Sequence, residues 1–205
     1  MSLSIRKKMQ ERIDSSQSGS AFIAQDFIDF APYNTIKQNL KRLNDDLIIK
    51  RALPGIYYKP KFSNLLNEYI PASPEEISKA IARNFNWTIA PEGNTALNML
   101  GLSTQVPYTY TYISSGPYRT YDFNGIQLKF EHRTSKDIEG FSELTAIIIQ
   151  ALKALGKEEI TSKHIDIIKS RLNSGQKKML LEEGKKTASW VYEYIKLICS
   201  EDSNV

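Results

Sequence analysis

Hydrophobic residues recur with the period of a helix near the start of the chain. Ile36, Leu40 and Leu43 stand at i, i+4 and i+7, so the pattern predicts an amphipathic helix over residues 33 to 45. Pro32 directly precedes that segment, in a position where the missing N–H of proline costs nothing. The helix is therefore expected to turn one apolar face to a core and to leave a polar face free.

The polar face of this helix carries amides, a hydroxyl and cations. Such groups are suited to contacts with base edges and phosphates, although a charged helix face is often plain solvated surface. The candidate DNA-binding residues on this face are Asn34, Thr35, Lys37, Gln38, Lys41 and Arg42. The elements that flank the helix are needed to distinguish a DNA-binding face from plain solvated surface.

A hairpin is expected directly after the helix. Residues 47 to 51 and 56 to 58 are strand-like, and Leu53-Pro54-Gly55 between them has the composition of a tight turn. A helix followed by such a hairpin indicates a winged helix-turn-helix over residues 22 to 60. That unit places its last helix in the major groove of DNA and its hairpin, the wing, beside the adjacent backbone. The same arrangement also occurs as a packing or partner-binding module, so the fold alone does not settle the function.

Two further helices are expected on the N-terminal side of the helix over residues 33 to 45. Residues 4 to 14 can form the first, and residues 24 to 30 a shorter second one with Phe27 and Ile28 turned inward. A Ser- and Gly-rich link at residues 15 to 20 separates them. The winged helix-turn-helix domain is accordingly assigned to residues 1–64.

Beyond residue 64 the pattern becomes that of a small sheet. Ser73-Pro74 is a helix start with serine at the N-cap. Tyrosines alternate with other residues over 106 to 113, which predicts a strand, and Asn124-Gly125 inside residues 121 to 131 predicts a hairpin. A short strand over residues 87 to 89 adds to the same sheet.

The last third of the chain is expected to be helical. Apolar stripes over residues 144 to 155, 161 to 172 and 187 to 199 predict three helices, and burial in a core is the favoured reason for them. The sequence thus predicts an α+β protein. Its second domain, residues 65–205, has a small mixed, mostly antiparallel sheet and a helical C-terminal part.

Charge separates the two domains. Residues 1 to 61 contain eleven Lys or Arg and six Asp or Glu, a balance of +5, while the other 144 residues contain 16 bases and 17 acids, a balance of −1. The positive excess lies on the segment that would meet phosphates. Double-stranded DNA is therefore the first partner to expect.

Composition excludes several other classes of protein. The chain has no apolar run of 18 or more residues and no signal-like N-terminus, so we expect a cytoplasmic protein with no membrane partner. Cys199 is the single cysteine and the two histidines are far apart, so no metal site and no cofactor is expected.

Two alternatives remain open. Asp122, Gln127 and Lys129 faintly resemble the acid and lysine cluster of metal-dependent nucleases, with Glu131 and His132 nearby, but such patterns arise by chance in polar hairpins. We therefore expect no enzyme activity. A transcription factor that senses a small ligand through its aromatic sheet is the other alternative.

Several motifs resemble a bacterial family. They are Ile89-Ala90-Pro91-Glu92-Gly93, the run from Ala96-Leu97-Asn98 to Thr104-Gln105-Val106-Pro107, the turn Ser115-Gly116-Pro117-Tyr118-Arg119-Thr120, and Gly55-Ile56-Tyr57-Tyr58 before Pro60. These motifs resemble uncharacterised relatives of the abortive-infection AbiEi antitoxins. The resemblance covers about residues 20 to 135, and the helical tail matches only in character.

The resemblance implies an antitoxin of a type IV toxin–antitoxin system. Such a protein represses its own operon through the winged helix and counters a nucleotidyltransferase-like toxin through its C-terminal part. It implies DNA contacts from Thr35, Lys37, Gln38, Lys41 and Arg42 on the helix, and from Lys50 and Arg51 on the wing. The Leu53-Pro54-Gly55 turn departs from the family pattern, since it lacks the basic residue that would enter the minor groove.

The run from Ala96 to Pro107 offers no acid, base or thiol. We interpret it as a structural corner between a helix and a strand, with Gly101 ending the helix. A binding loop made by Ser103, Thr104 and Gln105 is the alternative.

Overall fold

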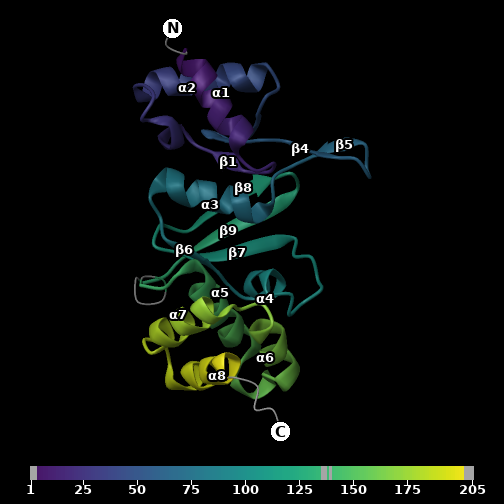
Figure 1. Cartoon of the computed structure of the whole chain (residues 1–205), viewed down its shortest axis with the longest axis vertical. Helices are drawn as coiled ribbons and strands as arrows, with labels where there is room; N and C mark the ends of the chain where they lie inside the picture. The colour runs from purple at the N-terminus through teal and green to yellow at the C-terminus, as the bar shows by residue number, and fades with distance from the viewer. Residues whose placement is uncertain (1–3, 135–137, 139, 201–205) are drawn as a thin grey trace. The chain divides into compact units, whose positions relative to one another are not determined.

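The computed structural model describes residues 4–134, 138 and 140–200 and contains two compact units (Figure 1). The first unit comprises Met1–Trp87 and Asp122–Ile126, and the second comprises Thr88–Tyr121 and Gln127–Val205. Helices and small sheets make up both units, so the expected α+β class is confirmed. Because the first unit continues to Trp87, it extends beyond the boundary expected after residue 64.

The first unit has the element order of a winged helix. Its elements are α1 (Ile5–Ser15), β1 (Ala21–Phe22), the 3-10 turn η1 (Ala24–Phe27), α2 (Tyr33–Asp45), β2 (Lys50–Leu53), β3 (Ile56–Tyr58), β4 (Lys61–Ser63), β5 (Glu68–Ile70) and α3 (Pro74–Phe85). Strands β1, β3 and β2 form one antiparallel sheet, in which Ala21 pairs with Tyr58 and Lys50 pairs with the same residue from the other side.

Helices α1 and α2 bury their apolar faces against η1 and this sheet. Met9, Phe27, Ile36 and Leu43 are fully buried there, as the helical spacing predicts. The expectation for Ile28 is wrong, because η1 ends at Phe27 and the side chain of Ile28 is 53 % exposed. The short 3-10 turn cannot present two successive residues to one core.

The chain leaves α2 by a turn, so the expected strand over residues 47 to 51 begins later. Leu47 has a φ of 61°, the N–H of Ile48 donates to the carbonyl of Leu43, and the N–H of Leu47 donates to that of Asn44. This is the Schellman pattern that closes a helix, here with leucine where glycine is usual. Strand β2 consequently runs from Lys50 to Leu53.

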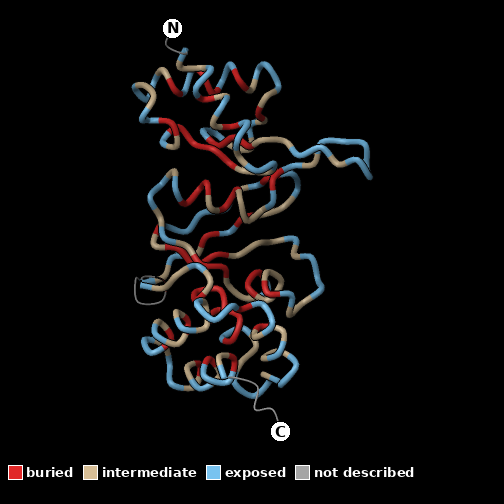
Figure 2. Tube along the Cα trace, viewed as in Figure 1, coloured by how far each residue is buried: buried red, intermediate tan, exposed pale blue. Residues whose placement is uncertain are grey.

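Two elements of the first unit lie outside the winged-helix core. Strands β4 and β5 form a separate two-stranded hairpin that projects from the unit and is largely exposed (Figures 1 and 2). Helix α3 packs on β1 and β3, with Ser73 capping it and Pro74 in the first turn as expected. Arg83 of α3 donates to the carbonyl of Ala21 at 2.9 Å, which ties this helix to the first strand.

The second unit combines a sheet with a helical layer. Its elements are β6 (Ile89–Pro91), α4 (Asn94–Met99), β7 (Thr109–Ser114), β8 (Arg119–Phe123), β9 (Ile126–His132), α5 (Glu143–Leu155), η3 (Lys157–Glu159), α6 (Ser162–Lys169), α7 (Ser174–Gly184) and α8 (Ser189–Cys199). The sheet order is β6-β7-β9-β8, with β6 antiparallel to β7 and β7 parallel to β9. Asn124 and Gly125 form the expected turn between β8 and β9, both with positive φ.

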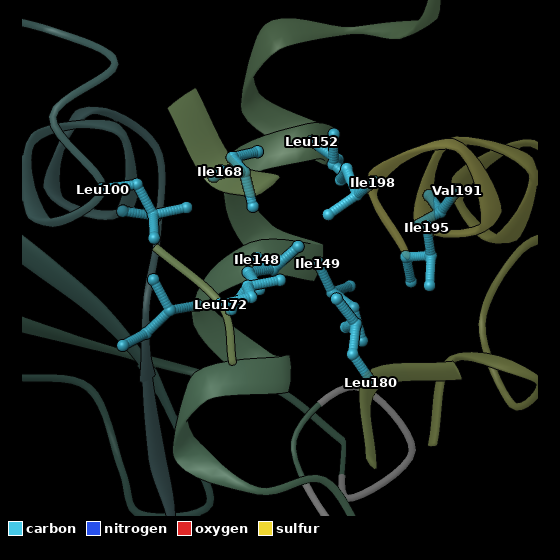
Figure 3. Close-up of a cluster of buried hydrophobic side chains, with 13 residues drawn as sticks. Leu100, Ile148, Ile149, Leu152, Ile168, Leu172, Leu180, Val191, Ile195 and Ile198 are labelled. Atoms are coloured by element: carbon cyan, nitrogen blue, oxygen red, sulfur yellow. The ribbon is translucent and has the colours of Figure 1, made fainter. Parts of the chain in front are cut away.

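The helices of this unit bury one continuous apolar cluster (Figure 3). Leu152 of α5 lies beside Ile198 of α8, and the side chains of Ile148, Leu152, Ile195 and Ile198 are all fully buried. Helix α7, which packs on α8, was not predicted from the sequence. Gly184 makes this packing possible, because a Cβ there would lie 2.9 Å from Ile195 Cδ1. The expected burial of the tail helix is confirmed for the apolar face of α8.

Candidate nucleic-acid interface

Helix α2 is held in place by its buried face, and its polar face is left free. Ile36, Leu40 and Leu43 are at most 1 % exposed, which confirms the predicted core face. Asn39 joins them, since its side chain is 7 % exposed and its Nδ2 donates to the carbonyl of Thr35 at 2.8 Å. This bond satisfies the buried amide inside the helix. The sequence pattern placed Asn34 and Gln38 on the polar face and assigned Asn39 neither to that face nor to the core.

The wing is attached to the end of α2 by a side chain of the helix. Asn44 Oδ1 accepts the N–H of Arg51 at 2.9 Å, which fixes the start of β2 beside the last turn of α2. The strands are joined by Pro54 and Gly55, and Gly55 has a φ of +80°, as a type II turn requires at its third position. The hairpin expected around Leu53-Pro54-Gly55 is confirmed, and its tip carries no cation.

Helix, wing and the start of η1 enclose a surface groove of about 630 Å³, hereafter the α2 groove. Its lining residues are Ala24, Tyr33, Asn34, Lys37, Gln38, Leu40, Lys41, Asn44, Asp45, Arg51, Gly55 and Tyr57. Three cations and one carboxylate lie in this lining, so the groove carries a net charge of +2. A groove of this sign attracts an anionic backbone.

The cations of the groove are not neutralised by the protein. Lys37, Lys41 and Arg51 are exposed, and none forms an ion pair within the described part of the chain. The amides of Asn34 and Gln38 likewise have no hydrogen-bond partner among the described residues. These groups are therefore free to bind phosphates and base edges.

The structure brings together only part of the predicted set. Asn34, Lys37, Gln38, Lys41 and Arg51 line the α2 groove. The other three predicted contacts, Thr35, Arg42 and Lys50, are not among its lining residues. Thr35 is half-buried, whereas Arg42 is exposed on the outer face of α2.

Lys50 differs from Arg51 because successive residues of a strand point to opposite faces. Its Nζ lies 5.4 Å from the ring centre of Tyr69, which belongs to the projecting hairpin. Lys50 thus contacts the β4–β5 hairpin, which was not predicted from the sequence. The sequence-based prediction also omitted Tyr33 and Asn44, which both line the groove. Tyr33 lies there because it stands on the exposed face of α2.

Two of the four cations of α1, Arg6 and Arg12, form ion pairs inside the unit, with Asp46 and Asp29 respectively. Arg12 forms a two-pronged ion pair with Asp29, at 2.9 and 2.7 Å, and its guanidinium lies 4.0 Å from the ring centre of Phe30. The hydrogen bond and charge of Asp29 raise the pKa of Arg12, and the same contact lowers the pKa of Asp29. Arg12 therefore clamps α1 to the loop before α2 and is not available to a phosphate.

Lys129 of the nuclease hypothesis and its neighbours Glu131 and His132 make contacts within the protein. Lys129 Nζ lies 2.7 Å from Glu131 Oε1, and this hydrogen bond lowers the pKa of Glu131 and raises that of Lys129. His132 Nδ1 lies 3.0 Å from the carbonyl of Gly116, and His164 Nδ1 accepts the N–H of Thr161 at the start of α6. Within the described ranges, no group of three or more His, Cys, Asp or Glu could hold a metal ion.

The corner between α4 and β7 is held by a side chain. Asn98 Nδ2 donates to the carbonyls of Gln105, at 2.8 Å, and Ser103, at 3.4 Å. Gly101 follows the helix with a φ of +68°, as the sequence predicts for a helix end. These contacts give Asn98 and Gly101 structural roles in the corner that require no ligand.

The fold and the groove define the first unit as a winged-helix domain. The chain belongs to DUF6088, a family of unknown function whose profile matches residues 8–180. A search among curated proteins found no match. Across the described residues, no helix is long and apolar enough to cross a membrane.

Proposed function

We propose that this protein binds double-stranded DNA at its own promoter and represses transcription there, as the antitoxin of a type IV toxin–antitoxin system. The observation that carries the DNA-binding part is the α2 groove, with its three unpaired cations beside two unpaired amides. In this proposal α2 enters the major groove, and the short wing stays beside the backbone.

The groups of the α2 groove divide into two roles. Lys37, Lys41 and Arg51 neutralise phosphates, which supplies affinity on any sequence and releases counterions. Asn34 and Gln38 can form paired hydrogen bonds to adenine, which supplies preference for a sequence. The positive excess of residues 1 to 61 supports the same partner.

The antitoxin part rests on the resemblance of residues 20 to 135 to relatives of AbiEi antitoxins. It assigns repression to the first unit and the relief of toxicity to the second. A toxin of the nucleotidyltransferase-like kind, encoded in the neighbouring gene, is the functional partner in this proposal.

The experiment for DNA binding is a gel-shift titration of the full chain on its own promoter at several salt concentrations. In the variant Lys37→Ala/Lys41→Ala, affinity should fall by about tenfold or more. The slope of log K against log salt should become shallower by about one unit for each lost phosphate contact. The matched control is Lys163→Ala/Lys178→Ala, which removes two exposed lysines of the second unit. Equal behaviour of the two double variants would refute α2 as the DNA-binding element.

The experiment for the antitoxin part uses cells that express the neighbouring toxin, with the full chain supplied from an unrelated promoter. Lys37→Ala/Lys41→Ala should lose repression of the native promoter and still relieve growth arrest, because relief is assigned to the second unit. A variant that loses both effects while remaining folded would contradict this division of labour.

A further inference from the structure

The second unit contains a pocket of about 650 Å³ between its sheet and α5, hereafter the Gln150 pocket. The pocket is lined by Glu92, Gly93, Asn94, Thr95, Thr109, Thr111, Ile113, Arg133, Gln150, Lys153 and Ala154. Most of these side chains are polar or charged, and all of them belong to one unit. The volume is within the range of small-molecule sites, roughly 300–1,000 Å³.

Gln150 is the unusual residue of this pocket. It interrupts the apolar run of α5, where its neighbours Ile149 and Ala151 are buried in the core of the unit. Its own side chain is only 5 % exposed, and it lines the pocket. No hydrogen-bond partner for its amide exists among the described residues.

The amide of Gln150 opens into the pocket, since its nitrogen and oxygen are not among the fully buried polar atoms without a partner. A leucine would fit the apolar run of α5 equally well but would offer no hydrogen bond to the pocket. The position is explained if the amide forms its hydrogen bonds to a molecule in the pocket. A buried donor and acceptor of this kind also gives the site specificity.

The facing wall of the pocket offers hydroxyls. Thr109, Thr111 and Ile113 alternate along β7 and so share one face of the sheet, opposite the face of Tyr112, whose ring stacks on Phe130. Thr95 is already used, since its Oγ1 accepts the N–H of Thr111 at 2.8 Å. Within the described chain, the hydroxyls of Thr109 and Thr111 have no hydrogen-bond partner and remain open to a ligand.

The charges of the lining favour an anion. Among the described lining residues, two are cationic, Lys153 and Arg133, and one is a carboxylate, Glu92. Arg133 lies 3.4 Å from Glu92 and 3.3 Å from Glu131. Both distances exceed the roughly 2.7–2.9 Å of strong charge-assisted bonds, so the guanidinium can turn to another acceptor at small cost.

We infer that the Gln150 pocket binds a small polar molecule that carries a carboxylate or phosphate group. Arg133 and Lys153 hold the anionic group, and Gln150 with the two threonines holds the remainder by hydrogen bonds. No aromatic side chain lines the pocket, so a ligand that binds by ring stacking fits less well. This site is independent of the α2 groove and of the proposed DNA binding.

The test is a titration of the isotopically labelled full chain with inorganic phosphate and with citrate, followed by two-dimensional NMR. Glycerol is the neutral comparison, and sodium chloride keeps the ionic strength constant. At least one anion should give saturable shifts at Thr111 and at the Gln150 side-chain amide, with a dissociation constant of about 1 mM or lower. Glycerol should give none. The absence of saturable shifts at these groups with both anions would overturn the proposal.

Two variants give the test its specificity. Gln150→Leu and Lys153→Gln should each weaken binding by about tenfold or more, since each removes a group that contacts the ligand. Lys163→Gln, which removes an exposed lysine from α6, is the matched control and should bind like the original chain. Unchanged binding by both pocket variants would show that the anions bind elsewhere.

A stability measurement separates a binding role from a structural one. Without ligand, Gln150→Leu should unfold at the same or a higher temperature, because the amide has no partner in the described chain and a leucine can pack beside the buried Ile149 and Ala151. A lower unfolding temperature for Gln150→Leu would show that the glutamine stabilises the empty protein, and would contradict the inference.

Discussion

The two units of this protein use charge in opposite ways. In the first, Lys37, Lys41 and Arg51 are gathered in a groove and have no ion-pair partner in the described chain. In the second, two exposed lysines are paired along single helices, Lys185 with Glu182 and Lys196 with Glu193. Such surface pairs contribute little to stability. The gathering of three cations in one groove, more than the lack of ion pairs, is what distinguishes the α2 groove from ordinary solvated surface.

The candidate sites of the two units also arise differently. The α2 groove depends on one helix face and the hairpin that follows it in the chain. The Gln150 pocket is lined by α4, β7, α5 and the residues that directly follow β6 and β9, and these segments lie far apart in sequence. Local periodicity can indicate the first kind of site, whereas the second exists only once the sheet has formed.

The largest expected effect tests whether the two units are stable independently. Each contains one of the two tryptophans, Trp87 in the first and Trp190 in the second, so fluorescence can report on each. Leu43→Ala is made in two backgrounds: Trp190→Phe, in which only Trp87 fluoresces, and Trp87→Phe, in which only Trp190 fluoresces. The unfolding free energy measured by Trp87 should fall by about 2–5 kcal/mol. The unfolding free energy measured by Trp190 should fall much less.

The reciprocal variant is Ile195→Ala, which truncates a fully buried side chain of the second unit. It should shift the Trp190 transition by a similar amount and leave that of Trp87 nearly unchanged. If each truncation shifts both transitions equally, the two units unfold as one and do not differ in stability.

A smaller effect concerns sequence preference in the α2 groove. Gln38→Ala should remove about 1–3 kcal/mol of discrimination between the promoter and random DNA, because a paired amide contact to a base is lost. Affinity for random DNA should change little, since the cations of the groove are kept. Competition gel shifts measure both quantities, and equal losses on both DNAs would mean that Gln38 only positions the helix.

The sequence predicted the first unit better than the second for a physical reason. The period of Ile36, Leu40 and Leu43 is a property of one helix, so it assigned four groove residues, Asn34, Lys37, Gln38 and Lys41, correctly to an exposed face. It could not separate Lys50 from Arg51, because the bulge between Arg51 and Leu53 and the hairpin at Tyr69 decide where those side chains point.

The same limit explains what was missed in the second unit. Gln150 stands among apolar residues, and a sequence pattern treats it as an interruption, although its surroundings make it the centre of a pocket. Helix α7 was missed because its apolar residues are few, and only Leu180 and Gly184 are buried. Its position depends on the contact between Gly184 and α8.

A further prediction concerns pH. Glu183 of α7 accepts from the N–H of Ser142 at 2.9 Å and from its hydroxyl at 2.8 Å, which joins α7 to the start of α5. Burial raises the pKa of Glu183, but hydrogen bonds from Thr145 and Ser142 outweigh it, so the net pKa lies below its ordinary value of 4.5. The carboxylate therefore stabilises the fold above pH 4.5, and this contribution is lost as the pH falls through the lower, folded pKa.

Glu183→Gln should accordingly cost about 1–2 kcal/mol of unfolding free energy at neutral pH. The cost should shrink as the pH falls below 4.5, because the original carboxyl then becomes protonated as well. Urea unfolding at a series of pH values measures this, with the exposed Glu193→Gln of α8 as control. A cost that is constant with pH would mean that the charge of Glu183 does not contribute.

The smallest expected effect is a gain in stability at the end of α2. Leu47 is 76 % exposed and has a φ of 61°, a left-handed conformation in which its Cβ is strained. Leu47→Gly should relieve that strain and stabilise the first unit by about 0.5–1 kcal/mol. Leu47→Ala keeps the Cβ and so should give no comparable gain, which makes it the matched control. Because Leu47 is not among the lining residues of the α2 groove, both variants should bind promoter DNA as the original chain does. Weaker binding by both would instead assign this exposed leucine, and the conformation in which the turn holds it, to contact with DNA.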